Sequence, residues 1–282
     1  MTVFLVPNLE KEEATGTMRK ILHILQKQNV HILMNDAIGA IFFAPEAEYL
    51  PEETCFKQCD VIITVGGDGT ILHTARRGFG YHKPMLGVNL GRLGFLATVE
   101  ADELEAKLTR LVKGAYTLDM RNILKVETGG GSSFCQTALN DVVIAKTDIS
   151  QTIDIAVFCD TILVNHFQGD GVIIATPTGS TAYSLSAGGP ILDAHIAGIV
   201  VTPICAHSMH SPPMVFSAAR KLRVCVKSPH TSGALMSCDG MEDRSIEGGE
   251  YVDVSLSDAY VALVCFNEAD QFEAIDKKLK GR

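Results

Sequence analysis

Short apolar runs alternate with amphipathic stretches over the first 114 residues of the chain. Four of these runs are mostly β-branched or otherwise apolar and predict buried strands, at residues 3–6, 30–34, 61–65 and 85–89. Residues 14–28 have apolar side chains at helical spacing, and residues 102–113 begin acidic and end basic, which favours a helix. Strands that alternate with helices predict an α/β domain with a doubly wound, Rossmann-like sheet. Residues 38–53 contain two prolines and predict a loop or a broken helix.

The pattern changes after Gly114, where short apolar runs follow one another without helical stretches. Turn residues separate ten such runs, at residues 123–127, 139–145, 153–158, 162–164, 171–176, 199–204, 222–226, 234–238, 251–256 and 260–266. This spacing predicts a β-rich, sandwich-like domain. Residues 129–133, Gly-Gly-Gly-Ser-Ser, predict an exposed hairpin loop.

These patterns divide the chain into two expected domains. We expect an α/β nucleotide-binding domain over residues 1–117 and a β-rich domain over residues 118–267. The tail, residues 268–282, predicts a short helix with a basic end, which we expect to pack back on the first domain.

Composition and charge narrow the class of protein. The formal net charge of the 282-residue chain is −9, which argues against a general nucleic-acid-binding protein because such a protein needs a basic face. The eight cysteines are scattered singly, and Cys55 and Cys59 lack the second pair that would complete a zinc site, so we interpret the cysteines as reduced, buried thiols. There is no signal pattern and no apolar run near the roughly 18 residues of a membrane span. We therefore expect a cytoplasmic protein without a membrane partner.

Residues 60–74 lead from a predicted buried strand into a glycine-rich turn and then into a helix. In open α/β sheets ligands bind at such strand ends, and helix N-termini favour phosphate. The turn holds one acid, Asp68, among Gly66, Gly67 and Gly69, and glycines let a ligand approach the backbone closely. An ordinary Asp-Gly turn is the simpler interpretation. The turn lacks the lysine of a P-loop, so backbone amides, a cation or distant basic residues would have to hold a phosphate.

A second segment, residues 169–190, is dense in glycine and hydroxyl side chains. A predicted strand follows Asp170 and ends in a turn where Ser180 or Thr181 is placed to cap a short helix. Tyr183 is placed to stack on a planar base, although a capped helix with a buried tyrosine is the simpler interpretation. So many glycines and hydroxyls in 22 residues favour a ligand site.

Acidic side chains adjoin apolar runs at two more places. Asn140 and Asp141 begin one run, and an unpaired carboxylate there is costly to bury. The pair therefore lies at a sheet edge or binds a hydroxyl-rich ligand. Asp239-Gly240 follows another run and is either a ligand-binding pair or a plain hairpin turn.

Taken together, five motifs make the chain resemble the NAD kinase family over most of its length. They are Gly66-Gly67-Asp68-Gly69-Thr70, residues 89–96 (Asn-Leu-Gly-Arg-Leu-Gly-Phe-Leu), Asn140-Asp141, residues 169–190, and Cys238-Asp239-Gly240. Phosphofructokinases and lipid kinases resemble the first motif, whereas the string over residues 176–190 is far more specific. This chain departs from the family at Asp141, because the usual pair is Asn-Glu and aspartate is one methylene shorter.

The resemblance implies that ATP phosphorylates the 2′-hydroxyl of the adenosine ribose of NAD, giving NADP. It also implies a site between the two domains and an assembly of identical subunits, a dimer or a tetramer. Asp68 would be the general base, Gly69 would lie against the ligand phosphates, and His73 would also bind nucleotide. The residues that would bind the NAD substrate are Asn140, Asp141, Asp170, Thr181, Ala182, Tyr183, Ser186 and Asp239.

The reaction implied here needs an acceptor for the ribose proton and neutralisation of the phosphate charge. We expect Mg²⁺ or another divalent cation to bind chiefly through ATP and not in an all-protein cage. Two other functions are compatible with parts of the sequence. A lipid or sugar kinase would share only the glycine-rich turn, and a non-catalytic sensor would bind NAD or NADPH without forming NADP.

Overall fold

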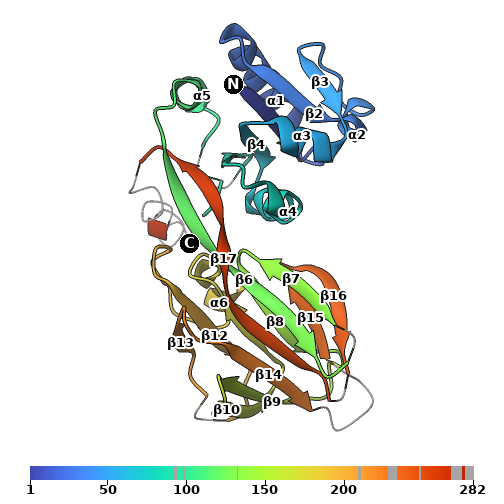
Figure 1. Cartoon of the computed structure of the whole chain (residues 1–282), viewed down its shortest axis with the longest axis vertical. Helices are drawn as coiled ribbons and strands as arrows, with labels where there is room; N and C mark the ends of the chain where they lie inside the picture. Colours follow the sequence, from blue (N-terminus) through green and yellow to red (C-terminus); the bar gives the residue numbers. More distant parts are fainter. Residues whose placement is uncertain are drawn as a thin grey trace. The chain divides into compact units, whose positions relative to one another are not determined.

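The computed structural model describes residues 1–91, 94–97, 99–131, 133–208, 211–227, 234–247, 249–267 and 275–276, without the side chains of residues 242 and 243. The chain forms two compact units (Figure 1). Unit 1 comprises Met1–Met120 and Val261–Arg282, and unit 2 comprises Arg121–Tyr260. Two long strands, β6 (Thr117–Gly129) and β17 (Tyr251–Cys265), each pass from one unit into the other.

Unit 1 is built on a parallel sheet with the strand order β17-β5-β4-β1-β2-β3. Its other strands are β1 (Thr2–Pro7), β2 (His31–Asn35), β3 (Ala47–Leu50), β4 (Val61–Gly66) and β5 (Met85–Asn89). Every residue of β4 and β5 is buried, as expected for central parallel strands that are covered on both faces.

Helices cover both faces of this sheet. Successive side chains of β1 point to opposite faces, and the side chains on each face contact helices. Val3 and Leu5 join one core cluster with the apolar faces of α1 (Ala14–Lys27) and α5 (Leu104–Val112). Phe4 points to the opposite face, where its ring meets Phe56 of α3 (Glu52–Gln58) edge to face at 5.1 Å. The remaining long helix, α4 (Asp68–Gly78), packs against β4 and β5. The doubly wound α/β fold predicted for this part of the chain is therefore confirmed.

The segment predicted as a loop or a broken helix holds more regular structure than its sequence pattern indicated. It contains the short helix α2 (Asp36–Gly39), the start of α3 and the edge strand β3. β3 has only four residues and no fully buried side chain, so it lacks the apolar run that identifies a strand. Its backbone pairs with β2 in parallel, Ile32 opposite Ala47, and that pairing is invisible in the local sequence.

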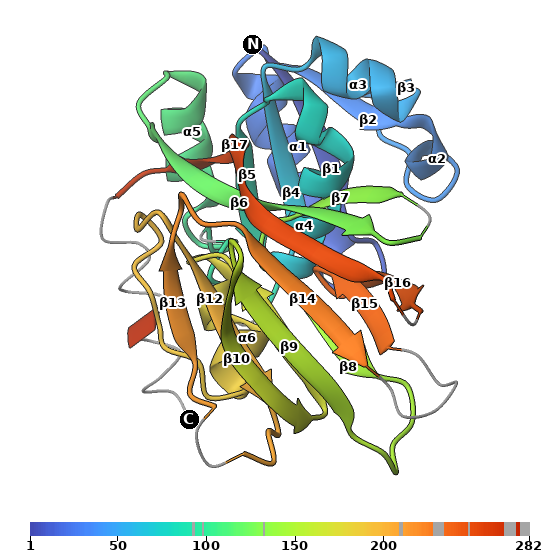
Figure 2. The ribbon, with the colours of Figure 1, turned by 60° about the horizontal axis from the view of Figure 1, so that its bottom comes forward.

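Unit 2 consists of two antiparallel sheets around one core (Figure 2). One sheet has the order β10-β9-β14-β17, with β9 (Ile153–Cys159), β10 (Ile162–Gly169) and β14 (Leu222–Lys227). The other has the order β13-β12-β11-β8-β15-β16. Its strands are β8 (Asp141–Lys146), β11 (Gly171–Ala175), β12 (Gly198–Ile204), β13 (Met214–Ser217), β15 (Ala234–Cys238) and β16 (Met241–Ile246). The predicted β-rich, layered architecture is confirmed.

Strand β11 lies in the middle of the second sheet and is buried on both faces. The hydroxyl-rich segment that follows it packs on one of these faces. Val172 and Ile174 of β11 face the main core, whereas Ile173 and Ala175 pack on the outer face with Ala187 and other residues. The short helices η2 (Gly179–Thr181) and α6 (Tyr183–Ser186) belong to the segment that follows β11, and α6 contacts that strand. The hydroxyl-rich segment is therefore packed on a rigid sheet.

Several local predictions for unit 2 need correction. The predicted runs at residues 251–256 and 260–266 belong to one continuous strand, β17, which ends at Cys265. The strands β7 (Phe134–Ala138), β13 and β16 were not predicted. The hairpin loop at residues 129–133 is confirmed for its described residues, because it joins the antiparallel strands β6 and β7 (Phe134–Ala138). The tail helix predicted over residues 268–282 lies outside the described residues, except for 275–276.

The prediction that the cysteines are buried holds only in part. Cys55, Cys59, Cys159 and Cys238 are buried, whereas Cys135 and Cys205 are exposed. Burial raises the pKa of Cys55 and of Cys59 to about 11, so both remain thiols. None of the described helices combines the length and the apolar character that a membrane span requires.

Candidate functional site

The glycine-rich turn joins β4 to α4 in the predicted way. β4 ends at Gly66, Gly67 is the N-cap residue, and Asp68 is the first residue of the helix. A Cβ on Gly66 would lie 2.1 Å from Oγ1 of Thr70, so the turn requires glycine there. Gly69 is exposed, and a Cβ added to it would meet nothing within 4 Å, which leaves room for a ligand against the backbone.

Asp68 is held by three successive backbone amides from the segment after β5. The N–H of Phe95 donates to Oδ2 at 2.8 Å, and the N–H groups of Leu96 and Ala97 each donate to Oδ1 at 3.0 Å. The side chain is half-buried. The carboxylate is therefore fixed at the first turn of α4, and it also orders residues 95–97.

Gly94 maintains this arrangement, because a Cβ at that position would lie 2.0 Å from Oδ1 of Asp68. On the general-base role that the family resemblance implies for Asp68, we expect Gly94→Ala to displace the carboxylate and to lower turnover by about tenfold to a hundredfold, the cost of misplacing such a group. The resemblance implies that residues of unit 2 bind NAD, so the affinity for NAD should change little. Steady-state kinetics and equilibrium dialysis with NAD would test this, and unchanged turnover would contradict it.

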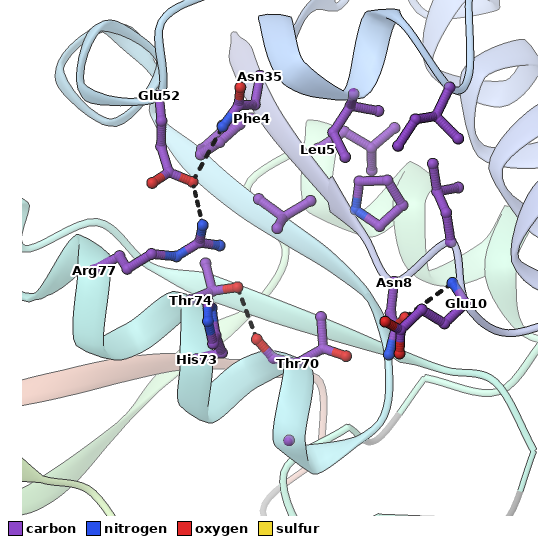
Figure 3. Close-up of a pocket in the computed structure, with 16 residues that line it drawn as sticks. Phe4, Leu5, Asn8, Glu10, Asn35, Glu52, Thr70, His73, Thr74 and Arg77 are labelled. Carbon is purple, nitrogen blue, oxygen red and sulfur yellow. Dashed lines mark hydrogen bonds and ion pairs between the residues drawn. The ribbon is translucent and has the colours of Figure 1, made fainter. Parts of the chain in front are cut away.

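A cavity of about 640 Å³ lies in unit 1 where the strand order reverses (Figure 3). β1 pairs with β2 on one side and with β4 on the other, and ligands bind at such switch points, outside the carboxyl ends of the strands. Gly69 and His73 line the cavity, as does Arg77 on the same face of α4. Partial desolvation, with a smaller effect of Arg77, lowers the pKa of His73, so its imidazole is neutral near pH 7.

Lys11 is a residue of this region that the sequence analysis missed. Its Nζ donates to the carbonyl of Leu90 at 3.0 Å and lies 3.5 Å from the position that a Cβ on Gly67 would occupy. It therefore places a positive charge beside the glycine-rich turn. The sequence did contain a signal for Lys11, because it is a basic residue that follows the first predicted strand closely. The carboxyl ends of neighbouring parallel strands lie at the same edge of the sheet, so this residue could be expected near the glycine-rich turn.

In unit 2, the hydroxyl-rich segment separates into side chains that build the loop and side chains that remain accessible. Thr176, Thr178, Ser180 and Ser184 are buried, and their hydroxyl groups bond within the protein. For example, Oγ1 of Thr176 donates to the carbonyl of Leu139 at 2.6 Å and accepts from the N–H of Gly179 at 3.0 Å. The predicted helix caps are absent, because neither η2 nor α6 has a side-chain cap and Ser180 donates instead to the carbonyl of Pro177.

The predicted ligand-binding positions of this segment are its accessible ones. The ring of Tyr183 is 46% exposed and is not buried as the simpler interpretation required. Ser186 is exposed, and Thr181 and Ala182 are half-buried. These four residues follow β11 directly and can present side chains and a planar ring to a nucleoside.

Asp239 organises the Asn140-Asp141 pair. Its carboxylate accepts from the N–H groups of Leu139 at 2.8 Å, Asn140 at 2.7 Å and Asp141 at 3.1 Å. Asp239 itself lies in the left-handed region, at a φ of 53°, within the tight turn between β15 and β16. The hairpin interpretation is therefore confirmed, and the carboxylate of Asp239 also holds the backbone of the Asn140-Asp141 pair.

The side chain of Asp141 is buried beside that second carboxylate. Burial and, to a lesser extent, the charge of Asp239 raise the pKa of Asp141 to about 7, although a hydrogen bond from the backbone N–H of Tyr183 lowers it. Asn140, Asp141, Tyr183 and Asp239 thus form one cluster. A carboxyl group that titrates near neutral pH is typical of functional sites.

Gly179 permits the close contact between the hydroxyl-rich loop and this pair, because its Cβ would lie 2.0 Å from the carbonyl oxygen of Asn140. On the NAD-binding role that the family resemblance implies for Asn140 and Asp141, we expect Gly179→Ala to push both residues aside and to raise KM for NAD by about tenfold, consistent with an overpacking cost of roughly 1–3 kcal/mol. Gly16→Ala in α1, where a Cβ meets nothing within 4 Å, is the matched control and should leave KM unchanged. Equal KM values in the two variants would contradict the expectation.

The structure does not bring Asp170 to this cluster. Asp170 precedes β11, whereas Thr181 and Tyr183 follow it, and five strand residues span roughly 17 Å. Its Oδ1 is paired with Nζ of Lys146 at 2.7 Å. Among the described residues, no group of three or more His, Cys, Asp or Glu side chains is arranged to hold a metal ion.

Comparison with known proteins matches both parts of the chain to one family. Residues 3–116 match the ATP-NAD kinase N-terminal domain and residues 139–266 match the ATP-NAD kinase C-terminal domain. An NAD kinase from Ruminiclostridium cellulolyticum is 34% identical over 279 residues, which cover 98% of this chain and 97% of the relative.

Two solved structures share the fold. The yeast NADH kinase complexed with NADH superposes with a TM-score of 0.88 at 24% identity, covering 99% of this chain and 87% of the yeast chain. An Archaeoglobus fulgidus NAD kinase in complex with ATP has a TM-score of 0.79 at 24% identity and full coverage of both chains. The two matched domains and the similarity over nearly the whole length show that the chain belongs to the ATP-NAD kinase family.

Proposed function

We propose that this protein is an NAD kinase, which transfers the γ-phosphoryl group of ATP to the 2′-hydroxyl of the adenosine ribose of NAD and produces NADP. The observation that carries the proposal is the 34% identity to a curated NAD kinase over 98% of the chain. The anchored Asp68 and the cluster around Asp141 supply side chains of the kind that this chemistry requires.

In this proposal the unit 2 cluster binds the adenosine part of NAD. The ring of Tyr183 stacks on the adenine, and Asn140 and Asp141 bond to the ribose hydroxyls. Thr181, Ala182 and Ser186 complete the pocket. Asp239 acts as a positioning residue, because its carboxylate is occupied by the three amides of residues 139–141.

Asp68 is proposed as the general base. A ribose hydroxyl is a weak nucleophile, and a fixed carboxylate lowers the barrier by accepting its proton as the new O–P bond forms. Three backbone amides hold Asp68 in place, so little reorganisation is needed when the substrate arrives. A divalent cation that is bound through the ATP phosphates would neutralise charge during transfer.

The alternative functions are not favoured. A lipid or sugar kinase would share only the glycine-rich turn, whereas here both domains match the ATP-NAD kinase family. A sensor would bind NAD without turnover, whereas the curated relatives that match 98% of this chain are named NAD kinases.

The test is direct. The purified protein is incubated with NAD, ATP and Mg²⁺, and NADP is measured with an NADP-specific dehydrogenase. We expect NADP formation that depends on both ATP and Mg²⁺. Two further assays replace NAD with NADH as the acceptor and ATP with inorganic polyphosphate as the donor. Binding of NAD without NADP formation under any of these conditions would overturn the proposal.

We also propose that the protein works in the cytoplasm as a dimer or a tetramer of identical subunits, as the resemblance to its family implies. Light scattering coupled to size-exclusion chromatography would measure the oligomeric state. A monomer at micromolar concentration would contradict this part of the proposal.

A further inference from the structure

A charged side chain is buried in unit 2 beside the hydroxyl-rich segment. Arg121 lies in β6 and is only 5% exposed, although a guanidinium carries its charge in any protein. Burial of a charge costs free energy unless ion pairs or hydrogen bonds compensate for it, and an apolar residue would avoid that cost. The contacts of Arg121 therefore indicate what this position does for the protein.

Arg121 holds one residue of the hydroxyl-rich segment. Its Nη1 donates to Oγ1 of Thr178 at 3.3 Å, across 57 residues of sequence, and Thr178 is also buried. The backbone carbonyl of Thr178 in turn accepts from Oγ1 of Thr181 at 3.0 Å. One residue thus connects the buried guanidinium to a hydroxyl group of the proposed adenosine site.

The chain that follows α6 also lies near Arg121. Hydrogen bonds from the backbone and the ring of His195 lower the pKa of Asp193, and the charge of Arg121 adds a smaller effect. The N–H of Leu192 donates to Oγ of Ser180 at 3.0 Å, which joins this part of the chain to the hydroxyl-rich turn. The segments before and after α6 therefore meet close to Arg121.

We propose that Arg121 is a positioning residue for the dinucleotide, which fixes the loop that presents Thr181 and Tyr183 to the adenosine without touching the ligand itself. This inference rests on the proposed function. Arginine suits the role because its planar fork has five N–H donors in fixed directions, whereas lysine is a flexible point charge. Without the guanidinium the loop can adopt several arrangements, and the affinity for NAD falls in proportion to the fraction that remains competent to bind.

A second arginine–threonine pair in unit 2 provides a matched control. Nη1 of Arg244 donates to Oγ1 of Thr128 at 2.5 Å, and the side chain of Arg244 is 17% exposed and pairs with Glu250 at 3.2 Å. Thr128 is seven residues beyond Arg121 on β6, which corresponds to roughly 24 Å along the strand. Loss of either arginine therefore removes buried interactions from the same unit, and Arg121 is the one that holds Thr178.

The first test compares Arg121→Met with Arg244→Met, since methionine keeps the apolar stem and removes the charge. Isothermal titration calorimetry measures Kd for NAD. Arg121→Met should raise Kd and KM for NAD by about tenfold, the effect of losing one hydrogen bond from a charged group. KM for ATP and kcat should stay within about twofold, because distant sites act independently. Arg244→Met should leave all four constants unchanged, even if urea unfolding shows an equal loss of stability.

The second test removes only the hydroxyl groups of the two pairs. Thr178→Val should weaken NAD binding by about threefold to tenfold, whereas Thr128→Val should not change it. Because Arg121→Met and Thr178→Val delete the same bond, the double variant should bind NAD no more weakly than Arg121→Met alone.

The inference is wrong, and Arg121 is a purely structural residue, if Arg121→Met keeps the wild-type Kd for NAD or if Arg244→Met weakens NAD binding equally. If Arg121→Met does not fold, the comparison of Thr178→Val with Thr128→Val decides by the same criterion. A wild type that binds NAD but makes no NADP would refute the proposed function, and the Kd values would still test the role of Arg121.

Discussion

Replacing Asp68 with asparagine is expected to lower turnover by about 10² to 10⁴, the usual range for the loss of a general base. The amide retains an oxygen for the N–H groups of Leu96 and Ala97 but turns an NH₂ group towards the N–H of Phe95. That lost bond should reduce the free energy of unfolding by roughly 1–3 kcal/mol. Steady-state kinetics, thermal unfolding and NAD binding measured on the same sample separate the chemical effect from the structural one.

Asp60→Asn is a matched control for this substitution. Asp60 stands at the opposite end of β4 and accepts one backbone bond, from the N–H of Thr2 at 2.7 Å, so it loses a similar interaction far from the turn. It should keep normal turnover. If Asp68→Asn also keeps near-normal turnover, the carboxylate is a structural anchor alone and the general-base assignment is wrong.

Replacing Asp141 with asparagine is expected to change how stability depends on pH. The pKa of Asp141 is about 7 in the folded protein and near its ordinary value of 3.8 when unfolded. Below about pH 4 the carboxyl group of Asp141 is protonated in both the folded and the unfolded protein. Between about pH 4 and pH 7 it is protonated only in the folded protein. The free energy of unfolding of the wild type therefore falls as pH rises through this window, by up to roughly 4 kcal/mol.

Asparagine cannot ionise, so the variant should lack this loss. Its stability relative to the wild type should rise by up to the same roughly 4 kcal/mol between pH 4 and pH 8, as measured by urea unfolding at several pH values. Asp160→Asn provides a control of opposite sign, since a hydrogen bond from Arg220 lowers the pKa of Asp160. Parallel pH profiles for the wild type and Asp141→Asn would show that Asp141 does not titrate in this range.

The same titration bears on substrate recognition. In the proposed complex with NAD, an ionised Asp141 can accept hydrogen bonds from both ribose hydroxyls, whereas the protonated group can accept fewer and donates one. The carboxyl group of Asp141, one methylene closer to the backbone than that of a glutamate, is buried near Asp239. The raised pKa of Asp141 is a consequence of that position.

The sheet of unit 1 could be predicted from sequence because its signals are local. β4 and β5 are continuous apolar runs, and α1 has its buried residues at helical spacing. Strands without such a pattern were missed. β3 has no buried residue, and β13 has four residues of alternating partial exposure, so each depends on a neighbouring strand that supplies its backbone bonds.

The site could be predicted in its components but not in its internal contacts. The motifs identified Asp68, Asn140, Asp141 and Asp239 as polar groups at strand ends. They did not indicate that Asp68 bonds to amides 27 to 29 residues away, or that Asp239 bonds to amides about 100 residues away. Asp170 belongs to a recognisable motif, yet β11 separates it from the other predicted residues.

Local periodicity was sufficient to predict the fold class, and the five motifs were sufficient for the family resemblance, because each depends on residues that are near one another in sequence. The tertiary structure decided which acids are held by backbone amides, which hydroxyls are buried and where the cavity along α4 lies. Those properties depend on how strands and loops from distant parts of the chain approach one another. A carboxylate becomes an anchor, or acquires a pKa near 7, only when such neighbours surround it.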